Sequence, residues 1–295
     1  MSFANLKRQS GNLDKLSAAI QTLNASSESS DSRDNYWKAE VDKSGNGMAT
    51  IRFLPASEKD GEDELPWVKV FSHGFQGPGG QWLIDYCLTT KNQQCPICEH
   101  NSTLWNSGIE ANKEVVRKQK RKLSYISNIY VVSDPKNPEN EGKVFLFKYG
   151  KKIFDKITEA MSPEFADETP INPFDMWKGA NFKLKIRKVE GYQNYDKSEF
   201  ESAAPLLDDD DGLEKVWKQE YCLKDLVGDS EFKSFDQLKS RLDKVLGLNG
   251  ETVSAKTTVE QMKSLPKKPV VDESQVMPEI EDDDMAYFSK LADED

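Results

Sequence analysis

The segment Tyr125-Ile-Ser-Asn-Ile-Tyr-Val-Val132 has the composition of a β-strand. β-Branched and aromatic side chains dominate it, and these side chains suit a pleated, half-buried surface. Glycine, proline and asparagine residues punctuate four further segments of the same kind, which are Ala49–Leu54, Val68–Phe71, Val144–Tyr149 and Phe182–Val189. Helices are expected at Lys151–Met161, Leu213–Leu226 and Phe235–Val245.

Short strands with interspersed helices predict a mainly β fold of the α+β class. We expect a partly open Greek-key barrel of the OB type, although periodicity alone does not select this barrel over other β-rich folds. The barrel is expected in a core that spans residues 36–250. A small basic arm (1–24) and a flexible Ser/Asp-rich linker (25–35) precede the core, and a disordered acidic tail (251–295) follows it.

The chain of 295 residues has a net charge of −11, but its charges are unevenly distributed. Ten acidic residues and one basic residue lie between Asp272 and Asp295, so the rest of the chain is almost neutral. Eleven basic and four acidic residues lie between Lys113 and Lys152. A basic centre with a separate acidic tail is typical of nucleic-acid-binding proteins.

The sequence has no run of 18 apolar residues, and its first residues lack the apolar stretch of a secretory signal peptide. We therefore expect a soluble, intracellular protein with no membrane partner. Three of the four cysteines lie within twelve residues. In a reducing compartment, such a cluster favours a metal over a disulfide.

Cys95-Pro-Ile-Cys98 is a motif whose two thiolates can bind the same tetrahedral ion, and Cys87 lies upstream as a third ligand. The chain has two histidines, and both flank this cluster. His100 follows Cys98 by only two positions and would have to fold back over the motif, so we favour His73 as the fourth ligand. The sequence thus predicts one structural zinc ion (Zn²⁺), in an inserted subdomain at about residues 67–125.

The alternative is that Cys87 is a core residue and that Cys95 and Cys98 form a redox pair. A catalytic zinc is disfavoured, because a closed set of one histidine and three cysteines leaves no open coordination position. Zinc-dependent nucleobase deaminases also require a His-x-Glu motif, whereas the residue at the glutamate position is Phe75.

Basic and aromatic residues are interleaved downstream of the cysteines. Single-strand binding needs cations along the phosphates and flat rings for the bases. Alternatively, lysines on a strand are a solvated face and roughly half of the aromatic residues belong to the core. The basic run Arg117–Lys122 favours the first interpretation, since like charges at this density repel unless an anion neutralises them. The candidate contacts are Lys120, Arg121, Lys122, Lys148, Tyr149, Lys151, Lys152 and Lys185.

Over about residues 36–200, the chain resembles the single-stranded DNA-binding (helix-destabilising) proteins of T-even-type bacteriophages. The motifs that carry the resemblance are Ala49-Thr-Ile-Arg-Phe-Leu-Pro55, His73-Gly-Phe75, Cys95-Pro-Ile-Cys98, Lys120-Arg-Lys122 with Ser124-Tyr125, Pro138-Glu-Asn-Glu-Gly-Lys-Val-Phe145, Tyr149-Gly-Lys-Lys152, Gly179-Ala-Asn-Phe182 and Gly191-Tyr-Gln-Asn-Tyr-Asp196.

The resemblance implies an OB-type core with a zinc ion held by one histidine and three cysteines, which match His73, Cys87, Cys95 and Cys98. It implies an N-terminal arm, here with Lys7 and Arg8, that contacts the neighbouring protomer on DNA. It also implies that the acidic tail recruits replication and recombination proteins. The stacking or cleft aromatic residues that it implies are Tyr125, Phe147, Tyr192 and Tyr195.

We therefore expect a non-enzymatic protein that coats single-stranded DNA cooperatively and without sequence preference in DNA replication, recombination and repair. The resemblance implies that it works in the cytoplasm of an infected bacterial host. One alternative is a single-stranded RNA-binding regulator, because stacking and phosphate contacts hardly discriminate against a 2′-hydroxyl. A second is a zinc-dependent nucleic-acid enzyme, although the sequence contains no Walker loop and no nucleophile elbow.

Overall fold

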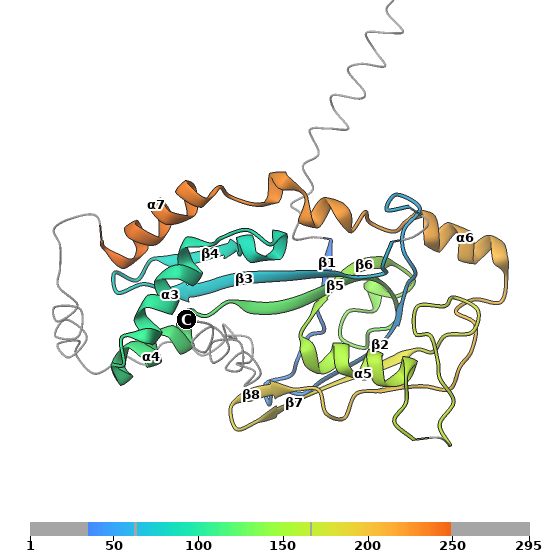
Figure 1. Cartoon of the computed structure of the whole chain (residues 1–295). Coiled ribbons are helices and arrows are strands. Elements are labelled where there is room, and N and C mark those ends of the chain that lie inside the picture. The colour runs from blue at the N-terminus through green and yellow to red at the C-terminus, as the bar shows by residue number, and fades with distance from the viewer. Residues whose placement is uncertain (1–34, 62–63, 166, 249–295) are drawn as a thin grey trace, which may run out of the picture. The chain divides into compact units, whose positions relative to one another are not determined.

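The computed structural model describes residues 35–61, 64–165 and 167–248 (Figure 1). The expected arm with Lys7 and Arg8, nearly all of the linker and the acidic tail lie outside the described residues. The chain forms two compact units, and the first of them ends at Trp37. Strand β1 (Tyr36–Trp37) therefore belongs to this N-terminal unit. All other described elements belong to a second unit, which begins at Lys38.

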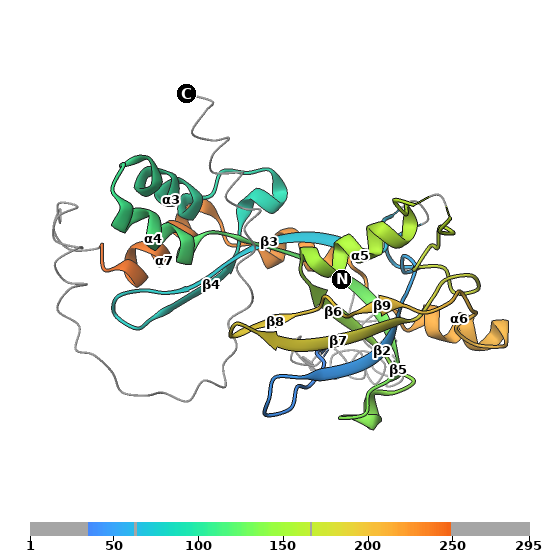
Figure 2. The same cartoon turned by 90° about the horizontal axis from the view of Figure 1, so that it is seen from below.

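The second unit is built on an antiparallel sheet around β5 (Lys122–Ser133). β3 (Val68–Gln76) and β2 (Gly47–Phe53) pair with β5 at its two ends, and β6 (Val144–Tyr149) pairs with its middle on the opposite edge. The edge of β2 that does not face β5 pairs with β7 (Phe182–Val189), as Figure 2 shows. β7 in turn pairs with the short strands β8 (Tyr192–Asn194) and β9 (Glu199–Phe200).

Helices cover the ends of this sheet. β4 (Trp82–Tyr86) forms a hairpin with the second half of β3, and α3 (Pro96–Asn106), α4 (Glu110–Gln119) and α7 (Phe235–Leu246) lie at that end (Figure 1). α5 (Lys151–Met161) and α6 (Asp210–Lys218) lie near the other strands. The 3-10 helices are η1 (Leu88–Lys91), η2 (Pro138–Asn140), η3 (Lys224–Val227) and η4 (Asp229–Glu231). None of the helices in the described ranges has the length and apolar character that a membrane crossing requires.

Two apolar clusters hold these elements together. Phe53 of β2 lies at the centre of an aromatic cluster, with ring centroids of Tyr149, Phe174 and Phe182 at 5.6, 5.7 and 5.8 Å. A second cluster packs Leu83 of the hairpin against α7 and α3, together with Phe75, Ile97, Leu238, Leu242 and Val245. Each fully buried side chain of this size stabilises the fold by about 1.5–3 kcal/mol.

Local signals determine where α7 begins and ends. Ser234 caps its first turn in a reciprocal capping box with Gln237, and Gly247 ends it in the left-handed conformation. The helix then lies so close to the β3–β4 turn that a Cβ on Gly77 would be 2.1 Å from the carbonyl oxygen of Val245. Glycine at position 77 is therefore required for α7 to pack on the hairpin.

The α+β class and its large antiparallel sheet are confirmed, and the described residues contain five α-helices. The predicted strands Val144–Tyr149 and Phe182–Val189 and the helix Lys151–Met161 have the predicted bounds. The prediction of one helix at Leu213–Leu226 was wrong. α6 ends at Lys218, because the Asn128 side chain bonds both main-chain groups of Tyr221 and Asp60 accepts hydrogen bonds from the next amides.

This connection between α6 and η3 also buries a carboxyl group. Glu220 is fully buried, and its two carboxyl oxygens have no hydrogen-bond partner in the described part of the chain. Burial, and then the nearby charge of Asp60, raise the pKa of Glu220 to about 9. The Glu220 side chain is therefore a neutral acid at pH 7.

We expect Glu220→Gln to remove a pH dependence of stability. The folded carboxyl holds its proton up to about pH 9, whereas the unfolded one releases it near 4.5, so the free energy of unfolding falls as pH rises through this window. The melting temperatures of wild type and Glu220→Gln should agree near pH 5. At pH 8.5 the variant should melt several degrees higher, since each kcal/mol is worth about 2–4 °C in a chain of this size.

The measurement is thermal unfolding followed by circular dichroism across this pH range. Glu231→Gln on the exposed η4 is the matched control, and its melting temperature should change with pH as that of wild type does. Parallel pH curves for wild type and Glu220→Gln would show that Glu220 is ionised in the folded protein.

Candidate metal centre and basic surface

Three neighbouring elements bring together one histidine and three cysteines. His73 lies in the middle of β3, Cys87 directly follows β4, and Cys95 and Cys98 lie at the start of α3. The Nε2 atom of His73 is 3.6 Å from each Sγ of Cys95 and Cys98, and the Sγ atoms of Cys87 and Cys98 are 3.5 Å apart. All four ligand atoms lie within 4.8 Å of one another.

These distances fit a tetrahedral metal site. A tetrahedron with metal–sulfur bonds of about 2.3 Å has edges of roughly 3.8 Å, close to the separations in this cluster. Hydrogen bonds with Cys87 and Cys98 lower the pKa of Cys95, which favours the thiolate, the form that binds metals. His73, Cys87 and Cys95 are buried, so protein atoms can fill all four coordination positions.

Hydrogen bonds outside the cluster orient the histidine ring. Nδ1 of His73 lies 3.2 Å from the carbonyl oxygen of Gln119, at the end of α4, so Nε2 is the nitrogen that faces the sulfurs. The same carbonyl accepts a hydrogen bond from Asn101 of α3 at 3.1 Å. Burial opposes charge on the His73 ring, but hydrogen bonds to Cys87 and Cys95 outweigh it and raise the pKa of His73 to about 9.

The three cysteines and the histidine that were predicted as ligands are the four residues that the structure brings together, and they could hold a metal ion. His100 is not a member of this cluster. Burial lowers the pKa of His100, which lies near Asp243. Cys222 lies beside Asp60, with Sγ 3.3 Å from Oδ1, and takes no part in the cluster.

A group of lysines lies where β5 begins and β6 ends. Lys120 is only 5% exposed. Burial, and then the charge of Lys120, lower the pKa of Lys122. Burial, and then the charge of Lys122, lower the pKa of Lys148, which faces Ile126 across the β5–β6 ladder. The three ammonium groups, here called the basic cluster, repel one another, and an anion would relieve this repulsion.

Arg121 connects the basic cluster to the metal site. Its guanidinium lies 4.2 Å from the ring centroid of Phe71 and donates a hydrogen bond of 2.6 Å to Oγ1 of Thr89. The same Thr89 oxygen lies 3.1 Å from Sγ of Cys87. Lys69 lies over the same Phe71 ring at 5.1 Å. Lys69 and Phe71 were not among the predicted contacts, although a cation and a ring at alternate positions of one strand are a signal in the sequence.

Other basic residues predicted as nucleic-acid contacts have carboxylate partners. Lys151 pairs with Asp155 at 3.2 Å and Lys185 with Glu199 at 2.6 Å. On the same strand as Lys185, Arg187 pairs with Asp196 at 2.6 Å. Lys152 lies in the first turn of α5 and is exposed. The positive charge of β7 is therefore largely neutralised by carboxylates.

The predicted aromatic contacts divide by burial. Tyr125, Phe147 and Tyr149 are 8%, 6% and 4% exposed and belong to the aromatic core. The ring of Tyr125 stacks on Phe154 of α5 at 3.8 Å between centroids. Tyr192 on β8 is 54% exposed, and Tyr195 is half-buried. Tyr192 thus presents a large ring surface to solvent, and base contacts by all five tyrosines and phenylalanines remain predictions.

The fold and the site define an α+β protein with a buried His/Cys₃ cluster beside a basic cluster. A sequence model of the family described as gp32 DNA binding protein like matches residues 45–246. A protein of Enterobacteria phage T4, named single-stranded DNA-binding protein, is 38% identical over 240 residues, which cover 79% of this chain and 77% of the relative. A protein of the same name from Enterobacteria phage T2 is 40% identical over 218 residues, covering 72% and 70%. The chain belongs to the gp32-like DNA binding protein family, which confirms the predicted resemblance.

We expect His73→Ala to release the bound metal and to lower the melting temperature, because it removes one of four ligands. His100→Ala is the matched control and should keep the metal, since this ring is not part of the cluster. Metal content per chain, measured by mass spectrometry after dialysis, shows which of the two variants keeps the metal. Loss of metal in His100→Ala with retention in His73→Ala would contradict the ligand assignment.

Proposed function

We propose that this protein binds single-stranded DNA without sequence preference and coats exposed strands in DNA replication, recombination and repair. Membership of the gp32-like family and the names of the phage relatives support this proposal. The observation that carries it in this chain is the basic cluster of Lys120, Lys122 and Lys148, in which burial and then a neighbouring positive charge lower the pKa of Lys122 and that of Lys148.

In this proposal, the phosphates of the strand neutralise the basic cluster and Arg121, and exposed rings such as Tyr192 stack on the bases. Each stacked base is worth roughly 1–3 kcal/mol whatever its identity, because every base has a π-face. We retain Lys152 as a phosphate contact. Lys151 and Lys185 are retained too, and they must exchange Asp155 and Glu199 for phosphate.

We propose that the metal is one zinc ion with a structural role and that the core is an OB-type barrel. Three cysteines and one histidine are the donor set of structural zinc sites, and zinc would tie β3, the residue after β4 and α3 to one point. Long β5, which pairs with β2, β3 and β6, suits the bent strands of such a barrel. The core is proposed to span residues 36–250, with the zinc subdomain at about 67–125.

Two further proposals concern segments outside the described residues. The arm of residues 1–24, with Lys7 and Arg8, would contact the neighbouring protomer and make binding cooperative. The linker of residues 25–35 would give this arm its reach. The acidic tail of residues 251–295 would recruit replication and recombination proteins. Its charge also suits a role as a DNA mimic that covers the basic surface.

We propose that the protein is not an enzyme and acts in the cytoplasm of the infected bacterium. Four protein ligands would leave the metal without the open position that catalysis requires. Single-stranded RNA is the competing ligand, because stacking barely senses a 2′-hydroxyl. The printed names of the relatives favour DNA.

We expect Lys122→Ala and Lys148→Ala each to weaken binding to a homopolymeric DNA strand and to make it less sensitive to salt. Each lost phosphate contact should reduce the slope of log affinity against log salt by roughly 0.7. Titrations at several salt concentrations measure both quantities. Lys218→Ala, whose lysine pairs with Glu214 on α6, is the matched control. An unchanged slope in both basic-cluster variants would place the phosphate path elsewhere.

Removal of residues 251–295 should strengthen single-strand binding at low salt, because the acidic tail would no longer compete with phosphates for the basic surface. The gain should shrink as salt rises, since ions screen both interactions. Full-length and 1–250 protein are compared by the same titrations. Coinciding curves at low salt would leave the tail only its role in partner recruitment.

A further inference from the structure

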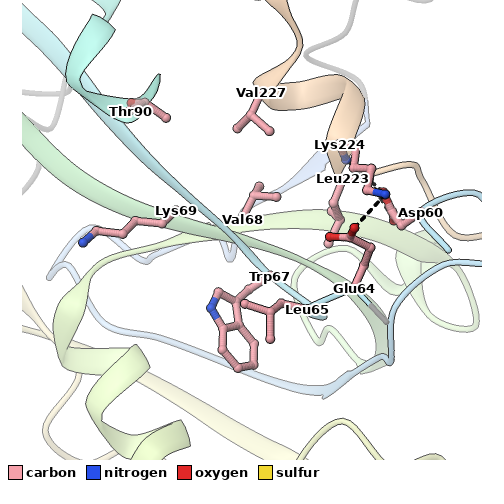
Figure 3. A pocket seen from close by; sticks show the side chains of 10 residues that line it. All are labelled: Asp60, Glu64, Leu65, Trp67, Val68, Lys69, Thr90, Leu223, Lys224 and Val227. Atoms are coloured by element: carbon pink, nitrogen blue, oxygen red, sulfur yellow. Dashed lines mark hydrogen bonds and ion pairs between the residues drawn. The ribbon is translucent and has the colours of Figure 1, made fainter. Parts of the chain in front are cut away.

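A pocket of about 240 Å³ opens at the first half of β3 (Figure 3). Its apolar wall comes from the start of β3 and from the connection that contains η3 on the opposite side. Thr90 of η1 and several charged residues complete the lining. The residues that the following argument uses are Trp67, Val68, Lys69, Leu223, Lys224 and Val227.

The pocket lies along an uncovered strand edge. β4 pairs only with Ser72–Gln76 of β3, so the preceding residues of this edge have no neighbouring strand among those described. Phe71 donates its N–H to Thr90 Oγ1 at 2.9 Å and accepts at its carbonyl from the Cys87 amide at 2.8 Å. Both groups therefore point away from β5.

Alternate residues of a strand direct their main-chain groups to the same side. Two residues before Phe71, the N–H and C=O of Lys69 consequently point to the pocket side of β3. Neither group has a hydrogen-bond partner in the described part of the chain. The pocket thus offers one donor and one acceptor on a rigid strand.

The charges around the pocket leave one cation available. Asp60 accepts hydrogen bonds from the amides of Leu223 and Lys224 at 3.1 and 2.9 Å. Glu64 pairs with the Lys224 ammonium at 2.8 Å, as Figure 3 shows. Lys69 has no carboxylate partner within the described ranges, and its ammonium lies over Phe71. An anion at the mouth of the pocket would therefore find an unneutralised ammonium group.

The pocket also adjoins the aromatic and basic residues of the proposed DNA site. The half-buried Trp67 ring meets Phe154 edge-on at 5.5 Å between centroids, and Phe154 stacks on Tyr125. Lys69 and Arg121 share the ring of Phe71. A strand bound by Arg121 and the basic cluster would thus pass the mouth of this pocket.

We propose that the pocket receives one nucleobase of the bound single strand. The base packs against the aliphatic side chains of Val68 and Val227, which point toward each other in Figure 3. Its polar edge bonds the main chain of Lys69, and the adjoining phosphate binds the Lys69 ammonium. All four bases carry a donor and an acceptor side by side, so this edge accepts each of them. The inference rests on the proposed single-strand binding and adds a defined base site to it.

The pocket can be filled without removing a charge. Val227→Phe on η3 should reduce affinity for an oligothymidylate by about 5-fold or more, the value of one stacked base, and should leave the salt slope unchanged. Lys69→Met should instead reduce the slope by roughly 0.7. Ile109→Phe, at an exposed position before α4, is the matched control for the added ring and should bind like wild type.

Photo-crosslinking with a 4-thiothymidine oligomer gives an independent readout on the unmodified protein. Crosslinks are expected at residues 67–69 of wild type and should disappear in Val227→Phe. The inference is overturned if wild type crosslinks only elsewhere, or if Val227→Phe folds and binds with wild-type affinity. Wild-type strand binding in those cases would leave the proposed function standing. Loss of a partner protein from Val227→Phe, with DNA affinity intact, would identify a peptide site instead.

Discussion

The antiparallel pairing of β3 with β5 is the constraint on which both the metal site and the basic surface depend. Its register places Val68 opposite Ile126 and Ser72 opposite Lys122. β3 continues beyond this ladder to His73, and β5 begins directly after Arg121. A slip of one residue would turn every side chain of one strand to the opposite face. The metal ligand and the cations therefore keep their places only in this register.

The metal cluster extends this constraint to the loops around it. The Gln119 carbonyl receives both Nδ1 of His73 and the Asn101 amide, so the end of α4 is tied to the cluster. The next residue, Lys120, begins the basic cluster. On the other side, Thr89 lies between Sγ of Cys87 and the guanidinium of Arg121. A structural metal would therefore hold in place the groups that we propose to bind phosphate, without itself contacting the nucleic acid.

Short-range features of the fold and site were predictable from the sequence. The Cys-x-x-Cys spacing identifies ligands because tetrahedral geometry restricts residues that are close in the chain, and the strand Val144–Tyr149 follows from local composition. Long-range partners were not predictable. Lys185 pairs with Glu199 only when β9 folds back on β7. The expected helix at Leu213–Leu226 is interrupted where the Asn128 side chain bonds Tyr221 and where Asp60 accepts a hydrogen bond from the Leu223 amide. Alternation shows which side chains share a face, but burial of that face depends on the packing of α5.

The cations of β7 and those of the basic cluster have different surroundings, and this difference has an energetic consequence. On β7, carboxylates neutralise Lys183, Lys185 and Arg187, so these cations contribute little long-range field. In the basic cluster, burial and then the charge of a neighbouring lysine lower the pKa of Lys122 and that of Lys148. A polyanion that removes this repulsion gains free energy at this place and not on β7. The cations at the start of β5 thus favour an anion more than those of β7 do, even though the chain as a whole is negatively charged.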